Sequence, residues 1–121
     1  FYDRDGYHPQ RAFAVPPGSL QGARDLGTLG GERSEARGVS NNGGVIVGWS
    51  ENHLGEIWAF SVRQFPYSGM RVLNPLAVCC GEANGVSNNG NVIVGRSHSA
   101  RTERWHACMW RWDGAHYAPT T

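Results

Sequence analysis

Lysine is absent from the chain, and all eleven basic residues are arginine. Ten acidic residues offset them, which leaves a formal net charge of +1. Because nucleic-acid binding draws its affinity from a broad basic face, this balance gives no argument for nucleic acid. The chain also lacks an apolar run long enough to cross a bilayer, so we expect no membrane-spanning segment.

Cysteine is scarce, with only Cys79, Cys80 and Cys108 present. Neighbouring cysteines rarely bridge each other, and a bridge from either one to Cys108 requires Cα atoms within about 7 Å. The spacing matches no zinc pattern, so we expect no metal and no cofactor. Buried free thiols are the expected state of all three residues.

Glycine and aromatic residues are plentiful. The chain contains 17 Gly, and its five Trp, four Tyr and four Phe can bury a large apolar area. Such a composition is typical of short strands joined by many turns, and it argues against disorder.

An internal repeat is the strongest signal in the sequence. Residues 35–50 match residues 82–97 at 13 of 16 positions, at an offset of 47 residues. With one extra loop residue, Trp58-Ala59 also aligns with His106-Ala107. We therefore predict a partial repeat unit at 1–31, a complete unit at 32–78 and a complete or nearly complete unit at 79–121.

Each unit is predicted to contain four strands. In the middle unit these are Ala36–Ser40, Val45–Ser50, Ile57–Arg63 and Met70–Leu76. The first two are joined by an Asn-Asn-Gly turn, because Asn and Gly both tolerate positive φ. The corresponding turn residues of the two units are Asn41, Asn42 and Gly43, and Asn88, Asn89 and Gly90.

The Val45-Ile46-Val47 run does not alternate with polar residues, so both faces of its strand should be buried. Stacked neighbouring sheets can provide that burial, and four strands in 40–50 residues are typical of β-propeller blades. We predict an all-β fold of propeller-like blades, with a β-solenoid as the alternative. Because a propeller needs about 4–8 blades, the rest would come from a longer chain or from other copies.

The ordered motifs Asp25-Leu-Gly-Thr-Leu-Gly-Gly31, Gly38-Val-Ser-Asn-Asn-Gly43 and Trp58-Ala-Phe60 resemble the HAF repeat. This is a family of bacterial extracellular repeats named for a His-Ala-Phe motif. The naming triplet departs from the family pattern, as Arg11-Ala-Phe13, Trp58-Ala-Phe60 and His106-Ala-Cys108. The resemblance implies an extracellular or cell-surface location and no nameable catalytic activity.

Catalysis is also disfavoured by the residues that recur. The repeated positions hold mostly Gly, Ser, Asn, Val and Ala, whereas a catalytic site gathers unlike reactive groups. Ser40 and Ser87 are expected to form hydrogen bonds within the turns. Glu35 and Glu82 are expected to accept hydrogen bonds from backbone or arginine groups between blades. We predict a protein that is not an enzyme.

Aromatic and arginine side chains near strand ends are the candidate ligand-binding residues. Exposed rings can stack on sugar faces while neighbouring polar groups bind hydroxyls, although ordinary packing is the alternative. The candidates are Trp49, Tyr67, Arg96, Trp105 and Trp112. Trp58 and Trp110 are instead expected in the core.

The predicted function is a non-enzymatic extracellular module for protein interaction or self-assembly. Its expected partners are copies of itself or the remainder of a longer repeat chain, with carbohydrate as a second ligand class at the blade rims. The alternative is a structural subunit of an extracellular filament or surface layer, joined by strand addition at open edges.

Overall fold

The computed structural model describes residues 12–14, 24–64, 67–75, 80–99 and 103–120. The strands found there are β1 (Ala12–Ala14), β2 (Arg24–Gly27), β3 (Gly30–Val39), β4 (Val45–Asn52), β5 (Ile57–Gln64), β6 (Tyr67–Val72), β7 (Gly81–Val86), β8 (Val92–Ser99), β9 (Arg104–Trp112) and β10 (Tyr117–Thr120). The all-β prediction is confirmed.

Two four-stranded antiparallel sheets follow one another along the chain. The first sheet is ordered β3-β4-β5-β6 and the second sheet is ordered β7-β8-β9-β10, while β1 pairs only with β2. The second sheet lies within the predicted 79–121 unit, whereas the first sheet begins at Gly30, before the start of the predicted 32–78 unit. Neither a closed barrel nor a propeller ring is formed by the described residues.

The fourth strand of the first sheet lies earlier than the predicted Met70–Leu76 and ends at Val72. The Leu73 amide still donates to the Ala59 carbonyl at 2.9 Å. The next carbonyl, that of Asn74, accepts a hydrogen bond from Trp110 of the second sheet. Pro75 then has no amide hydrogen to continue the ladder.

The repeated turn between the first two strands of each sheet is held by a serine and an asparagine. Ser40 Oγ accepts a hydrogen bond from the Val45 amide at 3.0 Å and donates to Asn42 Oδ1 at 2.6 Å. The Gly43 amide donates to the Ser40 carbonyl at 2.8 Å. The second sheet repeats these contacts through Ser87, Asn89, Gly90 and Val92. The expected turn and serine roles are confirmed.

Only the glycine of each Asn-Gly pair has positive φ, 74° for Gly43 and 80° for Gly90. Asn42 instead uses its side-chain oxygen to accept the Gly44 amide at 2.8 Å, in the manner of an Asx turn. Asn41 and Asn88 are exposed.

A second repeated feature is a glycine in the middle of strand two. The β3–β4 register shifts between Ala36 and Gly38, opposite Gly48, and the β7–β8 register shifts equivalently opposite Gly95. At both shifts the bulged strand passes close to the glycine. A Cβ on Gly48 would overlap the Glu35 carbonyl oxygen, and one on Gly95 would overlap that of Glu82. The repeated Val-Ile-Val-Gly sequence therefore reflects a repeated β-bulge.

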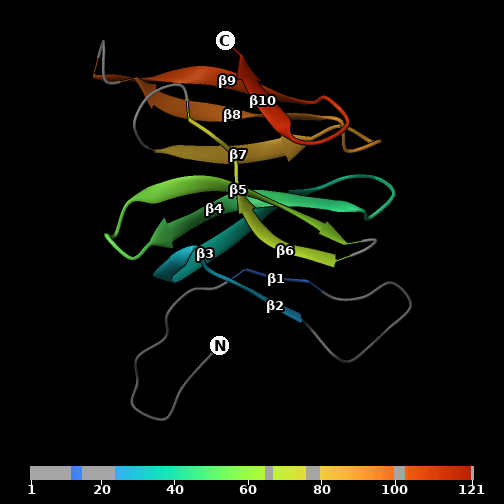
Figure 1. The fold of residues 1–121 in the computed structure, drawn as a ribbon, viewed down its shortest axis with the longest axis horizontal. Coiled ribbons are helices and arrows are strands. Elements are labelled where there is room, and N and C mark those ends of the chain that lie inside the picture. The colour runs from blue at the N-terminus through green and yellow to red at the C-terminus, as the bar shows by residue number, and fades with distance from the viewer. Residues whose placement is uncertain (1–11, 15–23, 65–66, 76–79, 100–102, 121) are drawn as a thin grey trace.

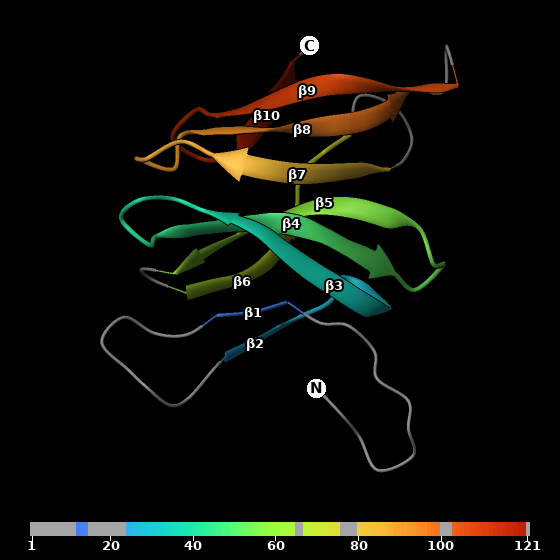
Figure 2. The same ribbon diagram turned by 180° about the vertical axis from the view of Figure 1, so that it is seen from behind.

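The sheets lie as layers, with the first sheet between the second sheet and the β1–β2 pair (Figures 1 and 2). Val45 and Val47 pack toward the second sheet, whereas Ile46 packs with Leu26 of β2. All three residues of the Val-Ile-Val run are buried, as predicted. In the second sheet the prediction fails, because Val94 is 50 % exposed on the face that no described layer covers.

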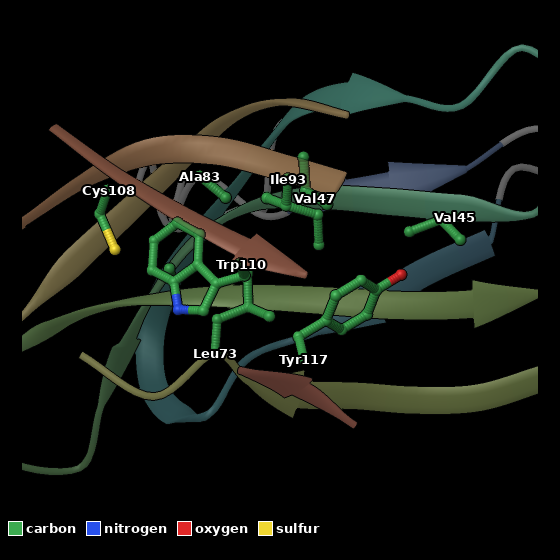
Figure 3. Packing of buried hydrophobic residues seen from close by; sticks show 9 residues of the cluster. Val45, Val47, Leu73, Ala83, Ile93, Cys108, Trp110 and Tyr117 are labelled. Carbon is green, nitrogen blue, oxygen red and sulfur yellow. The ribbon is translucent and has the colours of Figure 1, made fainter. Parts of the chain in front are cut away.

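The main core lies between the two large sheets and centres on Trp110, which is fully buried (Figure 3). Its indole Nε1 donates to the Asn74 carbonyl at 2.7 Å, which joins the second sheet to the segment after β6. The core prediction is confirmed for Trp110. Trp58 is only half-buried, because it lies near the hairpin end of β5, with Nε1 3.4 Å from Glu56 Oε1.

The cysteines differ from the expected three free thiols. Cys108 is free and buried, as predicted, whereas Cys80 is disulfide-bonded. Cys80 lies immediately before β7, in the connection between the two large sheets, and its backbone has a φ of 87°. Cys79 lies outside the described residues.

Burial also governs the reactivity of Cys108, because removal from water raises the pKa of its thiol. Since the thiolate is the nucleophile, we expect Ellman's reagent at pH 8 to label native Cys108 at least about a hundredfold more slowly than the unfolded chain. Mass spectrometry of the Cys108 peptide measures both rates. Equal rates would show that the inter-sheet core is open.

Candidate functional site

A cavity of about 700 Å³ lies between the two sheets at their β6 and β10 edges. One wall comes from β5, β6 and the residues after β6, and the other comes from the end of β9 through β10. The lining residues are Ser61, Arg63, Tyr67, Ser68, Arg71, Val72, Leu73, Asn74, Trp112, Ala115, His116 and Tyr117.

The cavity exists because the space between the sheets is filled differently at its two sides. At the β3 and β7 edges the backbones nearly touch, and a Cβ on Gly38 would lie 3.3 Å from the Gly85 Cα. At the β6 and β10 edges the large rings of Trp112 and Tyr117 stand between the sheets. The space between the sheets is thus bordered by small residues at one side and by large rings at the other.

An arginine and two aromatic rings form the floor of the cavity. The Arg63 guanidinium lies 4.2 Å from the centre of the Trp112 ring, a cation–π contact. The Trp112 and Tyr117 rings are 5.0 Å apart at an angle of 58°. The Tyr117 hydroxyl donates to the Gly90 carbonyl at 2.6 Å and accepts from Arg63 Nη1 at 3.3 Å. Burial raises the pKa of Tyr117, so the phenol stays neutral.

The rim of the cavity is open to solvent. Arg71 is exposed and its side chain makes no hydrogen bond or ion pair with the described part of the chain, and Tyr67 is 41 % exposed. His116 lies on the opposite wall, with Nε2 3.3 Å from Asp113 Oδ2. Hydrogen bonds from the His116 and Ala115 amides lower the pKa of Asp113. Among the described residues that line the cavity, none is acidic.

A second candidate surface is the uncovered face of the second sheet, here called the outer face. Strand alternation and register place on it Val92, Val94, Arg96, Trp105, Ala107, Met109 and Arg111. Val94 is the repeat equivalent of Val47, which is fully buried, and Ala107 is the equivalent of Ala59, which is also buried. Positions that the second sheet covers in the first unit are therefore exposed in the second unit.

Charged groups connect the two sheets next to this face. Arg37 of β3 donates to Glu82 at 3.2 Å and to Asn84 at 3.0 Å, both on β7. Glu82 also accepts from Arg96 at 3.2 Å, and the Arg96 guanidinium lies 4.5 Å from the centre of the Trp105 ring. The expected role of Glu82 as an acceptor for arginine between repeat units is confirmed.

The structure divides the five predicted ligand-binding residues among three places. Tyr67 and Trp112 line the cavity, and Arg96 and Trp105 lie on the outer face. Trp49 is 7 % exposed and donates through Nε1 to Glu35 at 3.0 Å, so the expectation that it is exposed is wrong. Trp49 and Arg96 share one repeat position, but only the strand of Trp49 is covered by a second sheet.

Sequence reasoning missed Arg63, Arg71 and Tyr117 as cavity residues. A signal existed for Arg63, because Arg111 occupies the same position in the next unit. No comparable pattern marks Arg71 or Tyr117, which line the same cavity because the β6 and β10 edges of different units face each other.

The described residues contain no group of three or more His, Cys, Asp or Glu side chains placed to bind a metal ion. Within the same part of the chain, no helix has the length and hydrophobicity needed to span a membrane. Comparison with models of protein families, with curated proteins and with solved structures found no match to the chain.

Proposed function

We propose that this chain is a non-enzymatic module that associates with further copies of itself through the outer face of the second sheet. The observation that carries the proposal is the difference between repeat-equivalent residues, with Val47 fully buried and Val94 50 % exposed. The same fold therefore contains one covered and one uncovered version of a single surface.

The face of the first sheet that the second sheet covers indicates what the equivalent outer face of the second sheet can bind. Arg63 of the first sheet stacks on Trp112 of the second, while its equivalent Arg111 is exposed and makes no ion pair in the described region. A Cβ on Gly38 would press on Gly85, whereas one on Gly85 would meet only Val94 Cγ2, at 3.5 Å. On the outer face, Gly85 thus leaves room for the backbone of a second copy. Within the chain, Gly38 leaves the same kind of room for the backbone of Gly85.

Apolar burial supplies a driving force for such stacking. Covering a valine side chain completely contributes about 1.5–3 kcal/mol, and Val94 and Trp105 are both substantially exposed on this face. Isolated monomers rarely leave a broad apolar face in water, and such faces mark interaction sites.

The wider setting of the proposal is a propeller-like stack of blades in a bacterial extracellular protein related to the HAF repeats. The two layered sheets, each formed by one repeat, are compatible with that architecture. The repeated motifs serve turns, bulges and inter-sheet contacts, which supports a structural and binding role over catalysis.

Replacing Val94 with glutamate tests the interface. An unpaired carboxylate there would have to be desolvated on association. We therefore expect the dissociation constant for self-association of the variant to be at least about tenfold higher than that of the wild type. Leu54→Glu is the matched control, because Leu54 is 70 % exposed at the tip of the β4–β5 hairpin and away from the outer face. Sedimentation velocity over a range of concentrations gives the mass of each protein.

The masses also separate the two proposed forms of assembly. A discrete oligomer indicates face-to-face pairing or a closed ring, whereas masses that grow without limit indicate a head-to-tail filament, the alternative structural role. A wild-type chain that stays monomeric at all concentrations would contradict both forms, as would equal association of Val94→Glu and the wild type.

A further inference from the structure

We propose that the cavity between the β6 and β10 edges binds a short acidic saccharide, such as an oligomer of uronic acid. This inference is independent of self-association, because the cavity lies between the sheets and the outer face lies on the opposite side of the second sheet.

The charge of the lining favours an anion. Arg63 and Arg71 are among the described residues that line the cavity, and none of those residues is Asp or Glu. Arg63 is held in place by Trp112 and Tyr117, whereas Arg71 is exposed and has no ion pair among the described residues. Arginine presents paired N–H groups that match the two oxygens of a carboxylate. Arg71 is thus available to bind a carboxylate at the mouth of the cavity.

The aromatic residues favour a sugar over a small inorganic anion. Tyr67 is exposed on one wall and Trp112 is half-buried on the other, so two rings border the same space. Aromatic rings offer apolar surface to the C–H faces of a sugar, while their polar neighbours bind its hydroxyls. A simple anion would gain nothing from the rings.

The polar groups are spread over both walls, which suits a ligand with hydroxyls on all sides. Asn74 is an exposed residue on the same wall as Arg71, and His116 lies on the opposite wall. The volume, about 700 Å³, is within the range of about 300–1,000 Å³ usual for small-molecule sites. An extended peptide would instead be expected to pair with the β6 or β10 edge through its backbone.

The experiment is a calorimetric titration of the 121-residue chain with tetragalacturonate, and with maltotetraose as a neutral oligosaccharide of equal length. We expect tetragalacturonate to bind with a Kd below about 1 mM and maltotetraose at least about tenfold more weakly, since the neutral sugar offers no carboxylate to hydrogen-bond with the arginines.

Two variants and a control locate the binding. Arg71→Ala and Tyr67→Ala replace exposed side chains, so both should fold, and each should weaken tetragalacturonate binding at least about tenfold. Arg104→Ala is the control. Arg104 is an exposed arginine at the start of β9, whereas Trp112 of the cavity is at the end of that strand, so this variant should bind like the wild type.

Several outcomes would overturn the proposal. They are equal binding of maltotetraose, binding of tetraglutamate or inorganic phosphate as tight as that of tetragalacturonate, and undiminished binding by both cavity variants. The absence of any tetragalacturonate binding would overturn it as well. Self-association of Val94→Glu is measured separately, so either proposal can fail alone.

Discussion

Replacing Gly48 with alanine is expected to be the most damaging single-methyl change in the chain. The added Cβ would overlap the Glu35 carbonyl oxygen where β3 bulges over β4. Backbone atoms cannot rotate away as a flexible side chain can, so relief requires moving the edge strand β3 away from β4. We expect a loss of at least about 3 kcal/mol, which is the upper range for overpacking.

Gly95 gives an internal test of the same prediction. It occupies the same repeat position in the second sheet, opposite the Glu82 carbonyl, and Gly95→Ala should cost a similar amount. Gly85→Ala is the control, because its Cβ would make only an ordinary 3.5 Å contact with Val94 Cγ2. We expect that control to remain within about 1 kcal/mol of the wild type.

Thermal unfolding by circular dichroism measures all three variants. A loss of about 3 kcal/mol should lower the Tm by about 10 °C or more in a domain of this size. An unchanged Tm for both Gly48→Ala and Gly95→Ala would show that the bulges are absent or that the strands are farther apart.

Removing the side chain of Trp110 is expected to have an effect of comparable size. Trp110 is fully buried between the sheets, and truncation of a core tryptophan to alanine costs about 3–5 kcal/mol. The Asn74 carbonyl would also lose the indole donor that now lies 2.7 Å away. Because both effects act at the inter-sheet core, the sheets should separate at lower denaturant concentration.

Trp110→Phe separates the hydrogen bond from the packing. Phenylalanine keeps most of the apolar contact but leaves the Asn74 carbonyl unpaired, which should cost about 1–3 kcal/mol. Trp105→Ala is the control, since Trp105 is 41 % exposed and lies on the outer face. Urea unfolding followed by circular dichroism measures the midpoint of each variant. We expect the lowest midpoint for Trp110→Ala, a higher one for Trp110→Phe and the highest for Trp105→Ala. A wild-type midpoint for Trp110→Ala would contradict the proposed core.

The local structure of each repeat was predictable because it depends on neighbouring residues. The Ser-Asn-Asn-Gly segments predicted the turns, and the Val-Ile-Val segments predicted the second strands. Burial of Val45–Val47 on both faces was predictable for the same reason, since a continuous apolar run in a strand has no polar face.

Features that depend on the number and angle of layers were not predictable. Val47 and Val94 have the same sequence context, yet only Val47 has a sheet above it. Trp49 and Arg96 differ in exposure for the same reason. The cavity is lined by residues from the β6 and β10 edges of two different repeat units, and that juxtaposition leaves no pattern in either strand.

Accessibility of the valine methyl groups tests the central claim most directly. In wild-type protein with methyl-labelled valine, a soluble paramagnetic agent should broaden the Val94 signals at low protein concentration and progressively less as the concentration rises. Val47 should stay protected throughout, because the second sheet covers it within one chain. Val94 signals that remain equally accessible at every concentration, or Val47 signals that are broadened too, would contradict the account.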